Sequence, residues 1–297
     1  MASLRLGTRA SRMALFQSEL VAEKLRAANP GLIVELVTIT TAGDADQTSP
    51  LTSGEGAGWF TTAIQDALLR REIDLAVHSY KDLPTKRPPG LSIAAIPVRG
   101  DPRDAFIGRT AKRLSELKPG AIIGTSSPRR MAQLLGIRSD IDVRPIRGNV
   151  DTRIAKLDAG DYDAIVVAYA GLVRLGVEAR ATAIFGYEEM LPSPAQGALA
   201  VECRSDDTAT RDLIRPIDDP ELRATVTAER TFLAHLEAGC NFPAAAYAER
   251  FGSTLKLHAH IAPENRIFRS KMAGPVGTAA GLGRALAEEL LALSARA

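Results

Sequence analysis

Short apolar runs alternate with stretches of helical periodicity along the first hundred residues. The predicted strands are residues 4–6, 32–39, 74–77 and 91–98. Between them, Met13, Phe16 and Leu20 recur at helical spacing, and 59–69 forms a second helical stretch. Strands that alternate with helices are typical of an α/β fold in which helices cover a mostly parallel sheet.

The same alternation starts again at Ala121. The second set of predicted elements comprises strands near 121–124, 141–146 and 163–168, with helices near 129–136 and 150–158. "LGTRASRMA" (6–14) resembles "IGTSSPRRMA" (123–132), and "IDLAVHSYKDL" (73–83) resembles "YDAIVVAYAGL" (162–172). We therefore predict two similar lobes that face a cleft.

The C-terminal part follows another pattern. Residues 221–238 are amphipathic and end at Ala238-Gly239, a usual helix stop. Alternation from Leu255 to Ile261 predicts a small sheet, and 276–293 predicts a closing helix. The expected domains are lobe one (1–98 and 198–216), lobe two (102–192) and an α+β domain (219–297).

Composition narrows the function classes. The chain has 297 residues, 45% of them hydrophobic, and a formal net charge of +2, so a broad nucleic-acid-binding face is not expected. No apolar run approaches the roughly 18 residues of a membrane span, and the N-terminus lacks a signal-peptide pattern. Four scattered histidines and two cysteines show no metal-ligand spacing. We expect a cytoplasmic, metal-free protein.

Each lobe places Gly-Thr at the end of a strand, just before a helix begins. Free backbone N–H groups and the helix dipole make such a turn a favourable seat for an anion. Lobe one adds Arg9 and Ser11, and lobe two adds Ser127, Arg129 and Arg130. Serine and threonine at these positions also serve as helix caps, so one turn alone is weak evidence. Arginines at several element ends favour a ligand with many carboxylates, each held bidentately.

The two lobes differ at one pair of residues. Where lobe two has Ala170-Gly171, lobe one has Lys81-Asp82 at the end of an apolar strand. A carboxylate in an arginine-rich cleft stays ionised and can stabilise a developing cation or handle a proton. The alternative is a structural Lys–Asp ion pair.

The two cysteines occupy different contexts. Cys203 lies in a predicted strand, "GALAVECR", and should be packed. Cys240 follows a helix stop in "EAGCNFP", where a loop can present its thiol.

Taken together, these stretches resemble the porphobilinogen deaminases, also called hydroxymethylbilane synthases. The resemblance covers nearly the whole chain and rests on several long motifs in the family's order. They are "LGTRASRMALFQ", "DLAVHSYKDLPT", "DPRDAF", "GTSSPRR", "IRGNVDTR", "YDAIVVAYAGLVRLG", "PAQGALAVECR" and "EAGCNFP".

The resemblance implies two periplasmic-binding-protein-like lobes and an α+β third domain. It implies stepwise condensation of four porphobilinogen molecules, with loss of ammonia each time, onto a dipyrromethane primer, and hydrolytic release of the linear tetrapyrrole. The primer would be a covalent cofactor, held by a thioether to the residue matching Cys240. Asp82 would contact pyrrole N–H groups and stabilise the azafulvene cation.

The resemblance also implies contacts to pyrrole carboxylates and to the primer. The matching residues are Arg9, Ser11, Gln17, Ser79, Lys81, Thr125, Ser127, Arg129, Arg130, Arg147, Asn149, Arg153, Arg174 and Gln196. Leucine in place of Arg129 or Arg130 is expected to block primer assembly or early elongation and to leave the fold intact. The expected partner is porphobilinogen, with no nucleic acid and no membrane, and the expected state is a monomer.

The chain departs from the family in the region over the cleft. The family's Gly-Lys-Gly-Leu-Phe and following Lys-Glu are here Gly56-Ala57-Gly58-Trp59-Phe60 and Thr62-Ala63, and a usual basic residue is Ala42. Lid charge is reduced, which puts in doubt how this loop engages substrate.

A two-lobed anion-binding protein without catalysis, such as a solute receptor or a regulator's effector domain, is the rival interpretation. A carboxylate receptor needs neither Lys81-Asp82 nor Cys240, and the expected absence of an export signal also disfavours it.

Overall fold

The computed structural model describes residues 2–41, 61–236 and 242–296. The chain divides into two compact units. The first comprises Met1–Gly100 and Ala198–Arg223, and the second comprises Asp101–Gly197 and Ala224–Ala297. The predicted lid before residue 61 and Cys240 lie outside the described residues.

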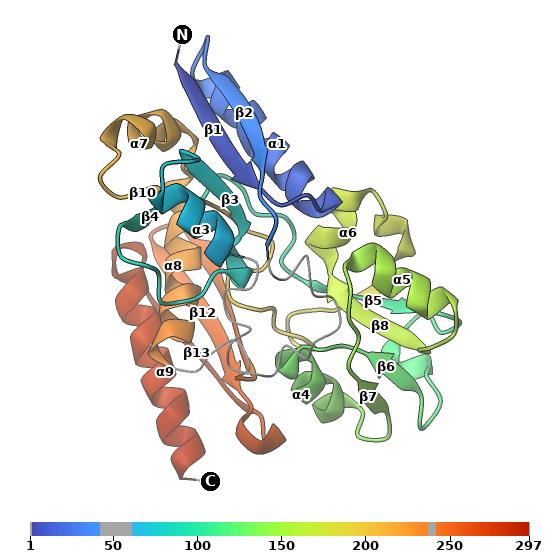
Figure 1. The fold of residues 1–297 in the computed structure, drawn as a ribbon. Coiled ribbons are helices and arrows are strands. Elements are labelled where there is room, and N and C mark those ends of the chain that lie inside the picture. The colour runs from blue at the N-terminus through green and yellow to red at the C-terminus, as the bar shows by residue number, and fades with distance from the viewer. Residues whose placement is uncertain (1, 42–60, 237–241, 297) are drawn as a thin grey trace. The chain divides into compact units, whose positions relative to one another are not determined.

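The first unit is built on a five-stranded sheet in the order β2-β1-β3-β10-β4 (Figure 1). Its strands are β1 (Ser3–Thr8), β2 (Ile33–Thr38), β3 (Leu75–Ser79), β4 (Leu91–Ala95) and β10 (Leu199–Arg204). Its helices are α1 (Arg12–Ala28), α3 (Thr62–Leu69), the 3₁₀ turn η2 (Tyr80–Asp82) and α7 (Thr208–Ile214). The strands β1, β2 and β3 are parallel, and β10 is antiparallel to both of its neighbours.

Both faces of this sheet are buried. On one face, Leu6 and Val201 pack with Leu25 of α1 and Ile214 of α7. On the other, Ala76 packs with Ile64 and Leu68 of α3. This explains why the strands read as nearly continuous apolar runs, as is usual for sheets covered on both sides.

The residues 101–197 form a second five-stranded sheet, in the order β7-β6-β8-β5-β9. Its strands are β5 (Asp104–Gly108), β6 (Ile122–Gly124), β7 (Asp142–Arg144), β8 (Ala164–Ala168) and β9 (Ala183–Ile184). Its helices are α4 (Pro128–Ile137), α5 (Val150–Asp158) and α6 (Tyr169–Leu175). Here β6, β7 and β8 are parallel, and β5 is antiparallel to β8 and β9.

The two sheets share one topology. The strands β2, β1, β3, β10 and β4 correspond in order to β7, β6, β8, β5 and β9. In each, the reversed strand is the first one that the chain enters after it arrives from the other lobe. The predicted pair of similar α/β lobes with mostly parallel sheets is confirmed.

The C-terminal part of the second unit is an antiparallel sheet in the order β11-β12-β13. The strands are β11 (Ala244–Phe251), β12 (Thr254–Ile261) and β13 (Phe268–Pro275), and the helices that pack on them are α8 (Pro220–His235) and α9 (Ala279–Ala295). Phe232 of α8 and Leu286 and Leu290 of α9 pack with Leu255 and Leu257 of β12. Figure 1 shows both helices running beside this sheet, so the predicted α+β class is confirmed.

Pattern reasoning located most of the elements that carry the candidate site. The expected strands at 4–6, 121–124 and 163–168 and the helices near 129–136 and 150–158 are present. The prediction named neither β5 nor β11 nor β13. Alanine is the best helix former, so the run "AAAYAERF" of β11 carries no strand signal of its own.

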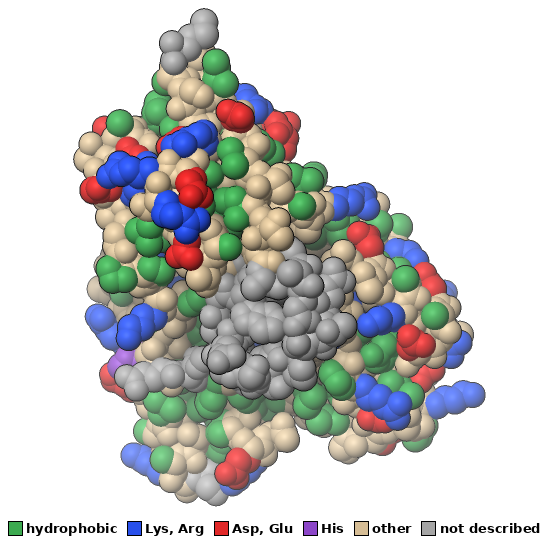
Figure 2. Space-filling view, in the orientation of Figure 1, with side chains coloured by type: hydrophobic (Ala, Val, Ile, Leu, Met, Phe, Trp, Pro, Cys, Tyr) green, Lys and Arg blue, Asp and Glu red, His purple; other side chains and the backbone are tan. Residues whose placement is uncertain are grey.

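Charged side chains of both signs are interspersed on the face of the molecule drawn in Figure 2. Ion pairs between exposed side chains include Arg70 with Glu72 and Arg71 with Asp206. Across the described ranges, the helices are all too short or too polar to cross a membrane.

One titratable group lies deep in the C-terminal sheet. His260 on β12 is fully buried, and its pKa is lowered to about 3 by burial and by the nearby charges of Arg129 and Arg269. The imidazole is therefore neutral in the folded chain across the physiological range.

This burial predicts a pH dependence of stability. Below the ordinary His pKa of 6.5, the unfolded chain binds a proton that the folded chain refuses, so stability falls as pH falls from 6.5 toward 3. Between pH 6.5 and 5 we expect a loss of about 1.6 kcal/mol from this group. Urea unfolding of wild type and His260→Leu across this range measures it. Equal slopes for the two proteins would contradict the prediction.

Candidate functional site

In the first unit, the candidate residues gather at the carboxyl ends of two neighbouring strands. The strand β1 ends at Thr8, just before Arg9 and Ser11, and β3 ends at Ser79. Because β1 and β3 are adjacent and parallel, these ends lie at the same edge of the sheet. Ligands in open α/β sheets bind at this edge.

The polar groups at this edge already hold one another in place. Ser11 is the N-cap of α1, and its hydroxyl accepts from the Ala14 amide. Gln17, buried on α1, donates from Nε2 to Ser79 Oγ at 3.0 Å. The structure thus joins α1 to the end of β3 through this bond.

Asp82 lies at the end of the turn that follows β3. The turn is fixed by the Tyr80 amide, which donates to the Ala198 carbonyl at 3.0 Å, and by the burial of Tyr80 and Leu83. Asp82 itself is exposed. Among the described residues, no ion pair joins Lys81 to Asp82.

In the second unit, the turn after β6 holds the corresponding groups. Thr125 is fully buried and its hydroxyl accepts from the Ser127 amide at 3.2 Å. Ser127 is the N-cap of α4 and accepts from the Arg130 amide. The Ser126 hydroxyl donates to the Ile146 carbonyl and accepts from the Ile146 amide, which fixes the loop that leads to Arg147.

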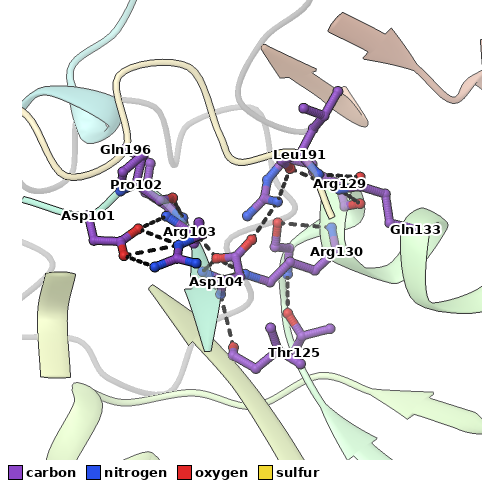
Figure 3. Close-up of polar contacts among 12 residues, drawn as sticks. Asp101, Pro102, Arg103, Asp104, Thr125, Arg129, Arg130, Gln133, Leu191 and Gln196 are labelled. Atoms are coloured by element: carbon purple, nitrogen blue, oxygen red, sulfur yellow. Dashed lines mark hydrogen bonds and ion pairs between the residues drawn. The ribbon is translucent and has the colours of Figure 1, made fainter. Parts of the chain in front are cut away.

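Arg129 and Arg130 are both buried on the first turn of α4, and both bind Asp104 (Figure 3). Arg129 Nη1 lies 2.7 Å from Asp104 Oδ2, and Arg130 Nη2 lies 2.7 Å from Oδ1. Gln196 Nε2 also donates to Asp104 Oδ1, at 2.8 Å, and to the Pro102 carbonyl, at 2.7 Å.

Two opposing effects set the charge states in this cluster: burial disfavours the charged forms, and ion pairing between Asp104 and the arginines favours them. Burial opposes the charge of Asp104, but the two guanidinium groups outweigh it and hold the pKa of that carboxyl well below its usual range. Burial lowers the pKa of Arg129, and Asp104 partly offsets this. One hydrogen-bond donor of Arg129 is unused, because its buried Nε has no partner among the residues that the structure describes.

Arg147, Asn149 and Arg153 lie around the start of α5. Asn149 is the N-cap and accepts from the Thr152 amide at 2.9 Å, while Arg153 Nε donates to the Gly148 carbonyl at 2.8 Å. Gly148 has φ of +105°, which favours glycine there. The Arg147 Nη2 atom is buried and finds no partner in the described ranges.

Arg174 on α6 is a buried cation of a different kind. Its Nη2 donates to the Gly197 carbonyl, and burial lowers the pKa of its guanidinium to about 10. No carboxylate among the described residues pairs with it. A ligand carboxylate there would relieve the cost of burying the charge.

The structure thus divides the predicted arginines into two sets. Arg129 and Arg130 have an internal counterion, whereas Arg147 and Arg174 lack one within the described residues. Sequence reasoning missed Asp104 as a member of the site. Its motif "DPRDAF" was visible, but nothing in one sequence joins Asp104 to arginines 25 and 26 residues away.

The described residues contain no group of three or more His, Cys, Asp or Glu side chains that could hold a metal ion.

The Asp104 cluster predicts a large effect of a small change. Asp104→Asn leaves two buried guanidinium groups without a carboxylate, and we expect the unfolding free energy to fall by about 3–5 kcal/mol. For the same reason, leucine at Arg129 or Arg130 should cost stability as well as function, contrary to the expectation from sequence that the fold stays intact. Chemical denaturation measures the loss. Asp140→Asn, which breaks the exposed pair with Arg138, is the control that should change little.

Comparison with known proteins places this chain in a family. Residues 4–212 match the family model "Porphobilinogen deaminase, dipyromethane cofactor binding domain", and 223–292 match "Porphobilinogen deaminase, C-terminal domain". The chain is 48% identical to the porphobilinogen deaminase of Acidothermus cellulolyticus (97% of this chain, 88% of the relative). It is 45% identical to that of Roseiflexus castenholzii (97% and 96%).

Among solved structures, the methionine-binding protein MetQ is similar at 14% identity with a TM-score of 0.46, over 79% of this chain and 94% of that one. The family models and the full-length relatives are decisive, and they agree with the resemblance seen in the motifs. The chain belongs to the porphobilinogen deaminase family of transferases, whose larger domain binds a dipyrromethane cofactor.

Proposed function

We propose that this chain condenses four porphobilinogen molecules stepwise onto a dipyrromethane primer, releasing ammonia at each step and finally the linear tetrapyrrole. The observation that carries the assignment of the site is the buried guanidinium of Arg174, which has no carboxylate partner among the described residues. Each pyrrole of the primer and substrate carries an acetate and a propionate, which are the anions that such a group binds.

The residues present fit the cofactor. In lobe two, the buried Arg147 Nη2 and Arg129 Nε atoms lack partners in the described ranges, so they can donate to carboxylates. We propose that the remaining contacts come from Thr125, Ser127, Arg130, Asn149, Arg153 and Gln196, with Arg9, Ser11, Gln17, Ser79 and Lys81 from lobe one. When bound, the primer supplies the pyrrole carbon to which the next ring is joined.

We assign the chemical step to Asp82. Loss of ammonia from porphobilinogen leaves a cation spread onto the pyrrole nitrogen, and a carboxylate held beside that nitrogen lowers the barrier. The Asp82 carboxylate is exposed at the end of a fixed turn, and no bond to another described residue occupies it. The corresponding residue of lobe two is Gly171, so the second lobe can bind anions there but cannot supply this charge.

We further propose the functional division into lobe one (1–98 and 198–216), lobe two (102–192) and a C-terminal domain (219–297) that carries the cofactor at Cys240. The small-molecule partner is porphobilinogen. We also propose a cytoplasmic monomer that binds no nucleic acid and no membrane.

The first test concerns the anchor of the primer. Cys240 should carry a two-pyrrole adduct in protein made by cells that synthesise porphobilinogen, and Ehrlich's reagent should colour the purified chain. The adduct should vanish in Cys240→Ser and persist in Cys203→Ser, because Cys203 is buried and burial raises the pKa of its thiol. Intact-protein mass decides the matter, and an unmodified wild type would sink the proposal.

The second test concerns Asp82. Asp82→Asn removes the charge and keeps the shape, so substrate should still bind while ammonia release slows by about 10²–10³-fold. Asp82→Glu should retain more activity than Asn. Single-turnover ammonia release with the primer in place separates this step from cofactor assembly. Wild-type rates in Asp82→Asn would mean that another group stabilises the cation.

A further inference from the structure

Glu229 on α8 is a fully buried carboxylate that joins two distant segments of backbone. Its Oε2 accepts from the Ala195 amide at 2.7 Å, and its Oε1 accepts from the Ala248 amide at 2.9 Å. Ala195 lies where the chain leaves the second lobe, and Ala248 lies on β11. A carboxyl group suits this position because each of its two oxygens accepts from a backbone amide, whereas a side-chain amide offers a single acceptor oxygen.

The contact to β11 lies within the C-terminal domain, on the strand edge that also contacts lobe two. The strand β11 is an edge strand, so every second N–H points away from the sheet. The Ala246 amide donates to the Pro192 carbonyl at 3.2 Å, and the next outward amide, that of Ala248, donates to Glu229. Beside this edge, the Tyr187 and Tyr247 rings stack with centroids 4.1 Å apart.

The contact to Ala195 fixes a strained residue. Ala195 has φ of +62° and is fully buried, a conformation that a residue with a side chain adopts only when its surroundings impose it. The next residue is Gln196, whose amide group holds Pro102 and Asp104 (Figure 3). Glu229 therefore holds the residue directly before Gln196. Because Gln196 in turn bonds to Asp104, this contact reaches the Asp104–arginine cluster.

We propose that Glu229 is a positioning residue for tetrapyrrole assembly. It belongs to α8, which precedes Cys240 in the chain, and it holds β11, which follows Cys240. Its second oxygen holds the segment that carries Gln196. One buried carboxylate thus joins α8 and β11, the elements on either side of Cys240 in the sequence, to the segment that carries Gln196. This inference rests on the proposed function, since it takes Cys240 as the anchor.

The experiment compares Glu229→Gln and Glu229→Asp with two reference variants. Leu286→Ala removes a fully buried side chain of α9 from the same domain and serves as the control for simple destabilisation. Gln196→Leu removes the partner through which Glu229 acts. Turnover, KM for porphobilinogen and intact mass are measured at a temperature at which each variant is folded, together with hydrogen exchange of the Ala195 and Ala248 amides.

We expect Glu229→Gln to carry the two-pyrrole adduct, to keep KM within about twofold and to lose turnover by about 10- to 100-fold, as for a small misplacement of reacting groups. Glu229→Asp should recover part of this loss, and Leu286→Ala should turn over normally. Adding Glu229→Gln to Gln196→Leu should lower turnover little further, because both changes break one chain of contacts.

Three results would overturn the proposal. These are normal turnover in Glu229→Gln, fully multiplicative losses in the double variant, or failure of both Glu229 variants to fold, which would leave the carboxylate a purely structural role. Absence of the adduct from wild type would instead contradict the proposed function, so the two failures are distinguishable.

Discussion

The burial of the Asp104 carboxylate is the constraint on which the second lobe depends. A fully buried charge costs several kcal/mol to desolvate unless partners surround it. Here two guanidinium groups of one helix and an amide from another stretch of chain do so. The segment entering the lobe supplies Asp104, the first turn of α4 supplies Arg129 and Arg130, and the segment leaving the lobe supplies Gln196. These elements must meet, or the charge is stranded.

This constraint also sorts the cations by what they can do. Arg129 and Arg130 are committed to an internal carboxylate, so they act as a rigid, oriented platform with few donors left over. Arg174 is buried with a carbonyl and no carboxylate among the described residues, so an anion beside it would offset the cost of burying its charge. The arginines with an internal carboxylate and the arginine without one therefore differ in what they can offer a ligand. Preorganised donors stabilise a charge most where water is excluded.

The two sheets have the same strand order, but the residues after corresponding strands differ between the lobes. Equivalent strands occur in the same order in both lobes, and in both the turns after the central strands present helix caps toward one edge. After β8 the chain continues into the helix α6, whereas after β3 it makes only a 3₁₀ turn that ends at Asp82. Both lobes have a helix cap after a central strand, but lobe one carries an acid, Asp82, where lobe two has Gly171. The C-terminal domain adds Glu229, which joins α8, the helix preceding Cys240, to the segment that carries Gln196.

The sequence by itself determined the elements whose signal is local. Apolar runs located β1, β6 and β8, the Gly-Thr turns located the helix starts, and the lobe echoes singled out Asp82. The tertiary structure decided which charges meet. Asp104 with Arg129 and Arg130, and Glu229 with Ala195 and Ala248, join segments far apart in the chain, and no periodicity records such pairing. The strand β11 was missed for the same physical reason: its alanines favour a helix locally, and only pairing with β12 and burial against α8 and α9 make it a strand.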